Sequence, residues 1–270
     1  MNDKILDMYK KQPKTWIISL AVGIGVLFLV AICLPYVNYR GIATNGIPIA
    51  TSILNSLVNP SFEMIFNLTK DGVPYLIFET IGIAFLGTII GAIISIPISF
   101  LASRNIFPNW FCSIWMLVIT VIRTFPAFVL GLMFIRVTGP GAFAGVLTLA
   151  LSSVGMISKL FIEVVEDLDQ GIIEALDSTG CTTFQKIRFG IIPQITSSFL
   201  SIAIYRFEIN IKNASILGLV GAGGIGTALL FSMGAARWRN VGAIIWGLVI
   251  TVIIFETISS RLRKKLTTGE

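Results

Sequence analysis

Long apolar runs dominate this sequence and decide what kind of structure it can form. A hydrocarbon core of about 30 Å requires roughly 20 consecutive apolar residues in helical form. Six runs reach or approach that length, namely residues 16–35, 75–103, 111–137, 139–160, 195–220 and 241–258. Because lipid offers the backbone no hydrogen-bonding partners, each run is expected to be a helix. The sequence therefore predicts an all-α polytopic membrane protein with about six transmembrane helices.

The composition supports this class and argues against several others. Apolar residues make up 55% of the chain and charged residues only 13%, which is outside the balance of a soluble domain. The chain has no histidine, and Cys33, Cys112 and Cys181 lack metal-site spacing, so we expect no metal, no cofactor and no disulfide framework. The apolar runs contain no paired aspartates, so we expect no catalytic residues.

The apolar runs divide the chain into segments. Residues 1–15 form a polar segment, residues 16–35 the first span, residues 36–74 an external loop with an interfacial helix around 53–68, and residues 75–265 a core with five spans. A signal peptide is the competing interpretation of residues 16–35. We prefer an uncleaved span, because the run is longer than a typical signal core and no small-x-small cleavage site ends it.

The distribution of lysine and arginine predicts the orientation. With the N-terminus in the cytoplasm, twelve basic residues fall inside and five outside. The positive-inside rule therefore favours two cytoplasmic termini and a cytoplasmic loop at residues 163–193. The net charge of +6 comes from residues at the ends of apolar runs rather than from one patch, so no nucleic-acid partner is expected.

That cytoplasmic loop contains the longest internal polar stretch, residues 174–193. A short helix is expected from residue 172 to 181, with Glu174 in an early turn where a carboxylate favours the helix dipole. Gly180 permits a sharp turn, a second short helix can run to residue 190, and Pro193 starts the fifth span. From the pattern alone, a compact helix-turn-helix and an ordinary solvated loop are equally good interpretations.

The same stretch resembles the cytoplasmic EAA loop of the permeases of ATP-binding cassette (ABC) importers. The matching residues are Glu174, Ala175, Leu176, Gly180, Ile192 and Pro193. The sequence departs from the family pattern at Gly190, where the family often has isoleucine, and at Leu176, which replaces a second alanine. The resemblance implies the type I importer permease fold and a loop that forms coupling helices docked on a cytoplasmic ATPase. No Walker A pattern occurs in this chain, so ATP would be hydrolysed by a separate subunit.

Two further stretches, residues 123–127 and 215–226, resemble permeases for phosphonates and related phosphorus oxyanions; methionine permeases are more distant. The resemblance implies import of phosphonate, phosphite or a phosphate ester by a homodimer with two ATPases and an external substrate-binding protein. One alternative is an importer permease for another small solute such as methionine. Another is an ion-coupled secondary transporter, although the hydropathy pattern contains no inverted repeat.

Charged residues inside the apolar runs point to the translocation path, because each is costly in hydrocarbon and tends to face water or the bundle interior. They are Glu79, Arg123, Arg206, Glu208, Lys212 and Glu256. Glu208 and Lys212 are four residues apart and are expected to pair, while Arg206 is expected to extend toward the cytoplasmic interface. Arg123 lacks a local partner, so it either pairs across helices or meets an anion. We expect the path to include Arg123, Thr124, Asn210, Lys212 and Asn213.

Glycines mark two further places. Gly87 and Gly91 have the spacing that allows close helix packing. The run 221–226 fits the dinucleotide pattern G-x-G-x-x-G, but it lies between two apolar runs and has no acidic residue about 20 positions later, so we reject that function. Its glycines either form a gate region or a simple external loop; the gate candidates are Gly221, Gly223, Gly224 and Gly226.

Overall fold

The computed structural model describes residues 15–36 and 46–268, and these residues form helices and no strands. The chain divides into two compact units, residues 1–50 and 51–270. The first unit contains α2 (Thr15–Cys33), followed by a 3-10 turn, η1 (Leu34–Tyr36). Within this unit, the apolar side chains of α2 whose exposure is described are all exposed. The predicted first span is therefore helical, while most of the polar N-terminal segment lies outside the described residues.

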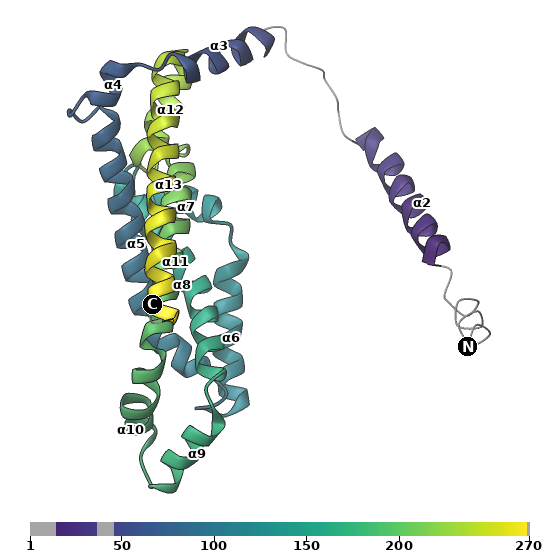
Figure 1. The fold of residues 1–270 in the computed structure, drawn as a ribbon, viewed down its shortest axis with the longest axis vertical. Coiled ribbons are helices and arrows are strands. Elements are labelled where there is room, and N and C mark those ends of the chain that lie inside the picture. The colour runs from purple at the N-terminus through teal and green to yellow at the C-terminus, as the bar shows by residue number, and fades with distance from the viewer. Residues whose placement is uncertain (1–14, 37–45, 269–270) are drawn as a thin grey trace, which may run out of the picture. The chain divides into compact units, whose positions relative to one another are not determined.

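The second unit is an elongated helical bundle (Figure 1). The helix α3 (Gly46–Val58) includes the boundary between the two units. The helices that follow it are α4 (Phe62–Phe66), α5 (Val73–Ala102), α6 (Asn109–Thr124), α7 (Ala127–Thr138), α8 (Ala142–Glu166), α9 (Gln170–Ser178), α10 (Thr183–Gln185), the π-helix η2 (Lys186–Ile191), α11 (Ile192–Gly218), α12 (Gly224–Gly234) and α13 (Trp238–Thr268). Within the described residues, five helices are long and apolar enough to cross a membrane, or six if the bent pair α6–α7 is one span. This agrees with the predicted number.

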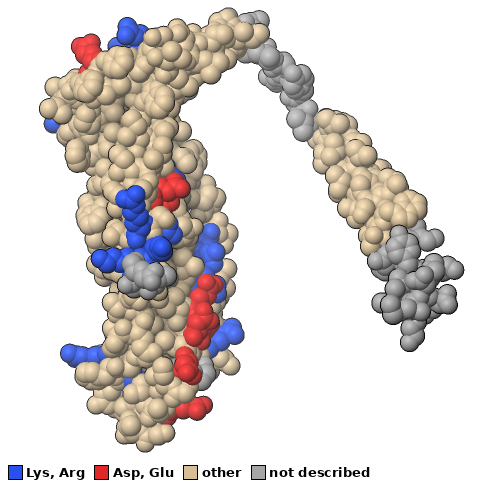
Figure 2. Space-filling model, in the orientation of Figure 1, with Lys and Arg blue, Asp and Glu red and all other residues tan. Residues whose placement is uncertain are grey.

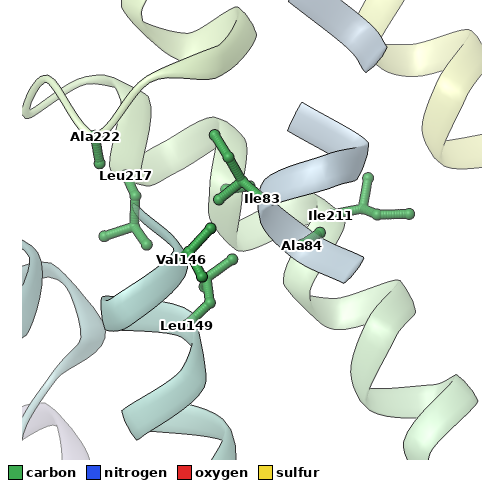
Figure 3. Packing of buried hydrophobic residues seen from close by; sticks show 8 residues of the cluster. Ile83, Ala84, Val146, Leu149, Ile211, Leu217 and Ala222 are labelled. Atoms are coloured by element: carbon green, nitrogen blue, oxygen red, sulfur yellow. The ribbon is translucent and has the colours of Figure 1, made fainter. Parts of the chain in front are cut away.

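The core of the bundle forms where α5, α8 and α11 meet. Figure 3 shows Ile83 and Ala84 from α5, Val146 and Leu149 from α8, and Ile211 and Leu217 from α11 around one apolar cluster. The two predicted packing glycines lie at this crossing. A Cβ atom on Gly87 would be 2.6 Å from Leu149 Cβ, and one on Gly91 would be 2.5 Å from Ser153 Cβ. Close contact of α5 and α8 therefore depends on small residues.

The third apolar run differs from the expected single helix. It breaks into α6 and α7, whose axes differ by 83°. Pro126 disfavours helical geometry at the residue before it, and Phe125 accordingly has an extended backbone with φ −80° and ψ 120°. The sequence contained this signal in the Phe125-Pro126 pair, but the length of the run obscured it.

Two shorter segments also differ from the prediction. The expected interfacial helix around residues 53–68 is replaced by the end of α3 and the separate helix α4, with Pro60 between them. The glycine-rich link was expected to connect the apolar runs 195–220 and 241–258. It is shorter than expected, because the helix α12 occupies residues 224–234. At 11 residues, α12 is too short to appear as a membrane span, which is why its apolar pattern was not counted.

Candidate functional site

The segment from α9 to the start of α11 forms a helix-turn-helix at one end of the bundle (Figure 1). Gly180 has φ +72° and reverses the chain between the two helices. Thr182 then caps the second helix, because its Oγ1 accepts a hydrogen bond from Gln185 N while Gln185 Oε1 accepts one from Thr182 N. The structure therefore favours the compact motif over an ordinary loop.

The second short helix continues into α11 through η2. Ile192 N donates to Ile187 O, five residues back, and the following residue is Pro193. Proline has no N–H with which to continue the α-helical ladder, so a local π-turn is a natural accommodation. Residues 183–218 consequently form one 36-residue helical segment. The expected new start at Pro193 is instead a change of helix type within this segment.

The helix-turn-helix is fixed to the bundle by one apolar face. Ile191 packs with Phe100 of α5, Val165 of α8 and Ile195 of α11, and all four side chains are buried. On the same motif, Phe184 is 68% exposed and Phe189 is 70% exposed. Large exposed aromatic side chains on a projecting motif are typical of a surface that contacts another protein.

Most of the other motif residues are also exposed. Glu174, Ala175, Gly180, Ile192 and Pro193 are exposed, and Leu176 is half-buried. Leu176 fills the space beside Gly190, where a Cβ atom would collide with Leu176 Cδ1. The two departures from the family pattern therefore occupy adjoining positions in the structure.

The five residues expected along the path lie on α6 and α11 and differ in exposure. Arg123 is exposed at the end of α6, and its stem lies against α8, since a Cβ atom on Gly155 would be 2.7 Å from Arg123 Cγ. Thr124 donates to Thr120 O at 2.9 Å. Asn213 is half-buried on α11. The Arg123 guanidinium forms no ion pair with any residue that the structure describes.

Lys212 belongs to a network of charges between α11 and α13. Lys212 Nζ lies 3.4 Å from Glu208 Oε1 and 3.2 Å from Glu256 Oε2, while Arg263 Nη2 lies 3.2 Å from Glu208 Oε2. The predicted pairing of Glu208 with Lys212 is confirmed. An open hollow of about 520 Å³ lies beside Glu256. In Figure 2, charged side chains lie at mid-height, toward the end that carries α9 and α10, and at the opposite end, while most of the surface is uncharged.

Arg206 corrects a prediction. Its side chain does not extend to the cytoplasmic interface; the residue is only 5% exposed. Nε donates to Ser153 Oγ at 3.0 Å, Nη2 to Ser152 Oγ at 2.9 Å, and Nη1 to Met156 Sδ at 2.8 Å. Three partners on α8 hold the guanidinium inside the bundle, and this outweighs the preference of a long cationic side chain for water.

Asn210 lies one helical turn after Arg206 and is fully buried. Its Nδ2 donates to Thr88 Oγ1 of α5 at 2.8 Å and to Ser153 Oγ of α8 at 2.9 Å. Arg206 and Asn210 thus share Ser153. Their four-residue spacing placed them on one helical face, but only the fold reveals that serines of α8 face them.

The glycine-rich link is a tightly packed connection. Gly221, Gly223 and Gly224 have positive φ angles of 90°, 83° and 71°. Gly221 O accepts a hydrogen bond from Gly141 N at 2.8 Å, and Thr80 Oγ1 accepts one from Ile225 N, also at 2.8 Å. Gly226 packs so closely on Ser215 O that a Cβ atom there would collide with it. This geometry excludes a loosely solvated loop.

The chain matches known transport proteins over most of its length. A family model described as "binding-protein-dependent transport system inner membrane component" matches residues 95–267. A phosphite transport system permease protein of Stutzerimonas stutzeri is 31% identical over 221 residues, covering 82% of this chain and 78% of that protein. A phosphate-import permease protein of Mycolicibacterium smegmatis is 35% identical over 189 residues, covering 70% of this chain and 36% of that protein.

A solved structure supports the same fold. The similar chain comes from an inward-facing methionine ABC transporter, with a TM-score of 0.63 and 20% identity, and the match covers 70% of this chain and 94% of that one. At this identity the likeness establishes the helical architecture, which is that of a type I importer permease.

Proposed function

Because this chain belongs to the family of inner membrane components of binding-protein-dependent transport systems, we propose that it is the permease subunit of an ABC importer for phosphonate, phosphite or a phosphate ester. The observation that carries the proposal is the identity of 31–35% to permeases named for phosphite and phosphate, over 70–82% of this chain. The chain carries out no chemistry itself in this proposal, and ATP is hydrolysed by a partner subunit.

The helix-turn-helix of α9, α10 and η2 is the proposed docking surface for that ATPase. Glu174, Phe184 and Phe189 offer a carboxylate and two aromatic side chains to a partner. Ile191 ties the same motif to α5, α8 and α11. A force applied to the exposed surface is therefore transmitted to three helices of the bundle core, which is the mechanical requirement for coupling ATP hydrolysis to transport.

The proposed path includes Arg123, Thr124 and Asn213, together with the buried Asn210 and the half-buried Lys212. Arg123 supports an anionic solute, because a guanidinium presents several donors to a tetrahedral oxyanion. Gly221, Gly223, Gly224 and Gly226 form the proposed gate region. Support for this role comes from the close packing of the link against α5 and α8 at the end of the bundle opposite the ATPase surface.

The proposed assembly is a homodimer with two ATPases and an external substrate-binding protein, embedded in the cell membrane. Both termini and the docking surface lie in the cytoplasm, as the distribution of basic residues suggests. Residues 36–74 then face the outside, and residues 75–265 form the transport core.

A methionine permease is the second candidate. A probable D-methionine permease of Haemophilus influenzae is 21% identical over 68% of this chain and 91% of that protein. The lower identity makes this solute the weaker proposal, and a secondary transporter has no comparable support.

Uptake by the reconstituted complex tests the proposal. The chain, its ATPase and its binding protein would be placed in proteoliposomes, and ATP-dependent uptake of methylphosphonate, phosphite, phosphate and methionine would be compared. We expect uptake of at least one phosphorus oxyanion and none of methionine. Methionine uptake without oxyanion uptake would establish the second candidate instead.

A further inference from the structure

The buried side chain of Arg206 is the strongest unassigned feature of the bundle. A guanidinium has five N–H donors and one positive charge, and burying it is costly unless a carboxylate or an equivalent set of acceptors compensates. Arg206 forms no ion pair with any residue among those the structure describes. Its three acceptors are two serine hydroxyls and a thioether, all of them neutral.

Several hydrogen-bond donors around Arg206 lack an acceptor, and the buried oxygen Asn210 Oδ1 beside them has no described partner either. The Ser152 and Ser153 hydroxyls accept from Arg206 but donate to no other described residue, whereas Thr88 and Thr148 donate to the carbonyl four residues back. Two guanidinium N–H groups also have no acceptor within the described chain. A positive charge surrounded by spare O–H and N–H groups is complementary to an anion rich in acceptor oxygens.

Met156 is the weakest partner in this group. A thioether is a poor hydrogen-bond acceptor for a charged N–H, and the methionine side chain is flexible. Met156 and Ser152 are half-buried, so this edge of the guanidinium lies near the surface of the bundle. Movement of one flexible side chain would expose Nη1 without moving a helix.

The position of the group fits a solute in transit. Thr88, which contacts the same cluster through Asn210, lies 15 residues into the 30-residue helix α5, about 22 Å from its start. Lipid headgroups do not reach the middle of a span, so the anion expected here comes from water rather than from the membrane. Arg123 packs against Gly155, on the α8 turn that also carries Ser152 and Met156. Two cationic side chains thus flank one turn of α8.

We propose that Arg206, Ser152 and Ser153 form a binding site for a phosphorus oxyanion halfway through the bundle, and that Met156 covers this site when it is empty. The inference rests on the proposed function and adds the residues that select the solute. The guanidinium fork donates to two oxygens of the anion, and the serine hydroxyls donate to the others. Because the Met156 thioether is a weak acceptor, the anion replaces it without breaking a strong hydrogen bond. This suits a site that must also release the anion.

Variants in the reconstituted importer test the site. Arg206→Lys keeps the positive charge and removes the paired N–H donors of the guanidinium, and Arg206→Met keeps a similar volume and removes both the charge and the donors. Ser152→Ala removes one hydroxyl donor. Met156→Leu removes only the sulfur atom. Arg136→Gln is a matched control, since Arg136 is an exposed arginine of α7 outside this cluster. Uptake of phosphite or methylphosphonate, ATP hydrolysis and the thermal unfolding midpoint would be measured for equal amounts of assembled complex.

The expected pattern separates binding from structure. Both Arg206 variants should lower oxyanion uptake about tenfold or more, since hydrogen bonds to charged groups are the strong ones, while ATP hydrolysis and the unfolding midpoint remain close to wild type. Ser152→Ala should lower uptake several-fold, and Met156→Leu and Arg136→Gln should leave uptake within about twofold of wild type.

Two results would overturn the site. One is normal oxyanion uptake per assembled complex in Arg206→Met. The other is a parallel loss of uptake, ATP hydrolysis and thermal stability in both Arg206 variants, which would identify Arg206 as a structural tie between α8 and α11. If the wild-type complex imported none of the tested oxyanions, the proposed function would fail before any variant was compared.

Discussion

Leu176 and Gly190 occupy adjoining space in the helix-turn-helix, so that a side chain at position 190 would collide with Leu176 Cδ1. Each residue departs from the pattern of the family loop, and the two departures compensate. A larger residue on α9 is matched by the smallest residue on η2. In the helix-turn-helix, Leu176 of α9 therefore supplies the bulk that a larger side chain at position 190 would otherwise supply.

This relationship predicts a compensating double variant. Gly190→Ile should collide with Leu176, and Leu176→Ala should leave a gap, each lowering stability by about 1–3 kcal/mol. The double variant should recover most of the loss, because contacting residues couple by about 0.5–3 kcal/mol. Thermal unfolding of the three variants and recovery of the ATPase on purification measure this. Additive losses in the double variant would contradict the packing described.

Glu174→Lys is expected to weaken ATPase binding without unfolding the chain. Glu174 is exposed, so reversing its charge should change the docking surface and leave the bundle intact. Co-purification of the ATPase should fall clearly, while the unfolding midpoint stays near wild type. Lys70→Glu reverses a charge far from the helix-turn-helix and serves as the control. Retention of both the complex and its transport activity in Glu174→Lys would defeat the coupling role.

Gly180→Arg tests the turn between the two short helices. Gly180 has φ +72°, and a residue with a Cβ atom adopts this conformation at a cost of about 1 kcal/mol. We expect lower ATPase recovery than for wild type, accompanied by a small drop in stability. Gly180→Asn, which tolerates positive φ better, should recover part of the loss. Equal effects of asparagine and arginine would show that the backbone conformation is not the cause.

Arg123→Gln should reduce oxyanion uptake while the complex assembles normally. Arg123 is exposed and packs only through its stem on Gly155, so removing the charge leaves the helix contact in place. A hydrogen bond to a charged group contributes about 1.5–3 kcal/mol, which corresponds to a reduction of about tenfold or more. Uptake assays in proteoliposomes measure this. Unchanged uptake at normal assembly would remove Arg123 from the path.

Glu208→Ala should destabilise the contact between α11 and α13. The Glu208 side chain is 9% exposed and lies between Lys212 and Arg263, so its removal leaves two cations close together. Because both cations are partly exposed, we expect a loss of about 1–3 kcal/mol rather than the full value for a buried pair. Glu208→Ala/Arg263→Met should be less destabilised than Glu208→Ala. Thermal unfolding of both variants decides this, and a greater loss in the double variant would contradict it.

The number and places of the long helices could be predicted from the sequence, because lipid imposes a minimum length on each span. The orientation of the Arg206 side chain could not be predicted, since its serine partners belong to α8, more than 50 residues earlier. The same limit applied to Phe184, whose helical face is known only once Ile187 and Ile191 pack on the bundle. The break at Pro126 was visible locally, yet an uninterrupted apolar run dominated the interpretation.

The continuous helical segment from Thr183 to Gly218, which includes the π-helix η2, has a mechanical consequence. At about 1.5 Å per residue its 36 residues measure about 54 Å, so in the proposed function it would act as a lever between the proposed ATPase surface and the glycine-rich link. A tilt of about 5° around its lower end displaces its upper end by about 5 Å, close to the rise of one helical turn. In the proposed coupling, a modest tilt imposed at η2 would therefore become a displacement of several ångströms near Gly221, where the link packs closely on its neighbours.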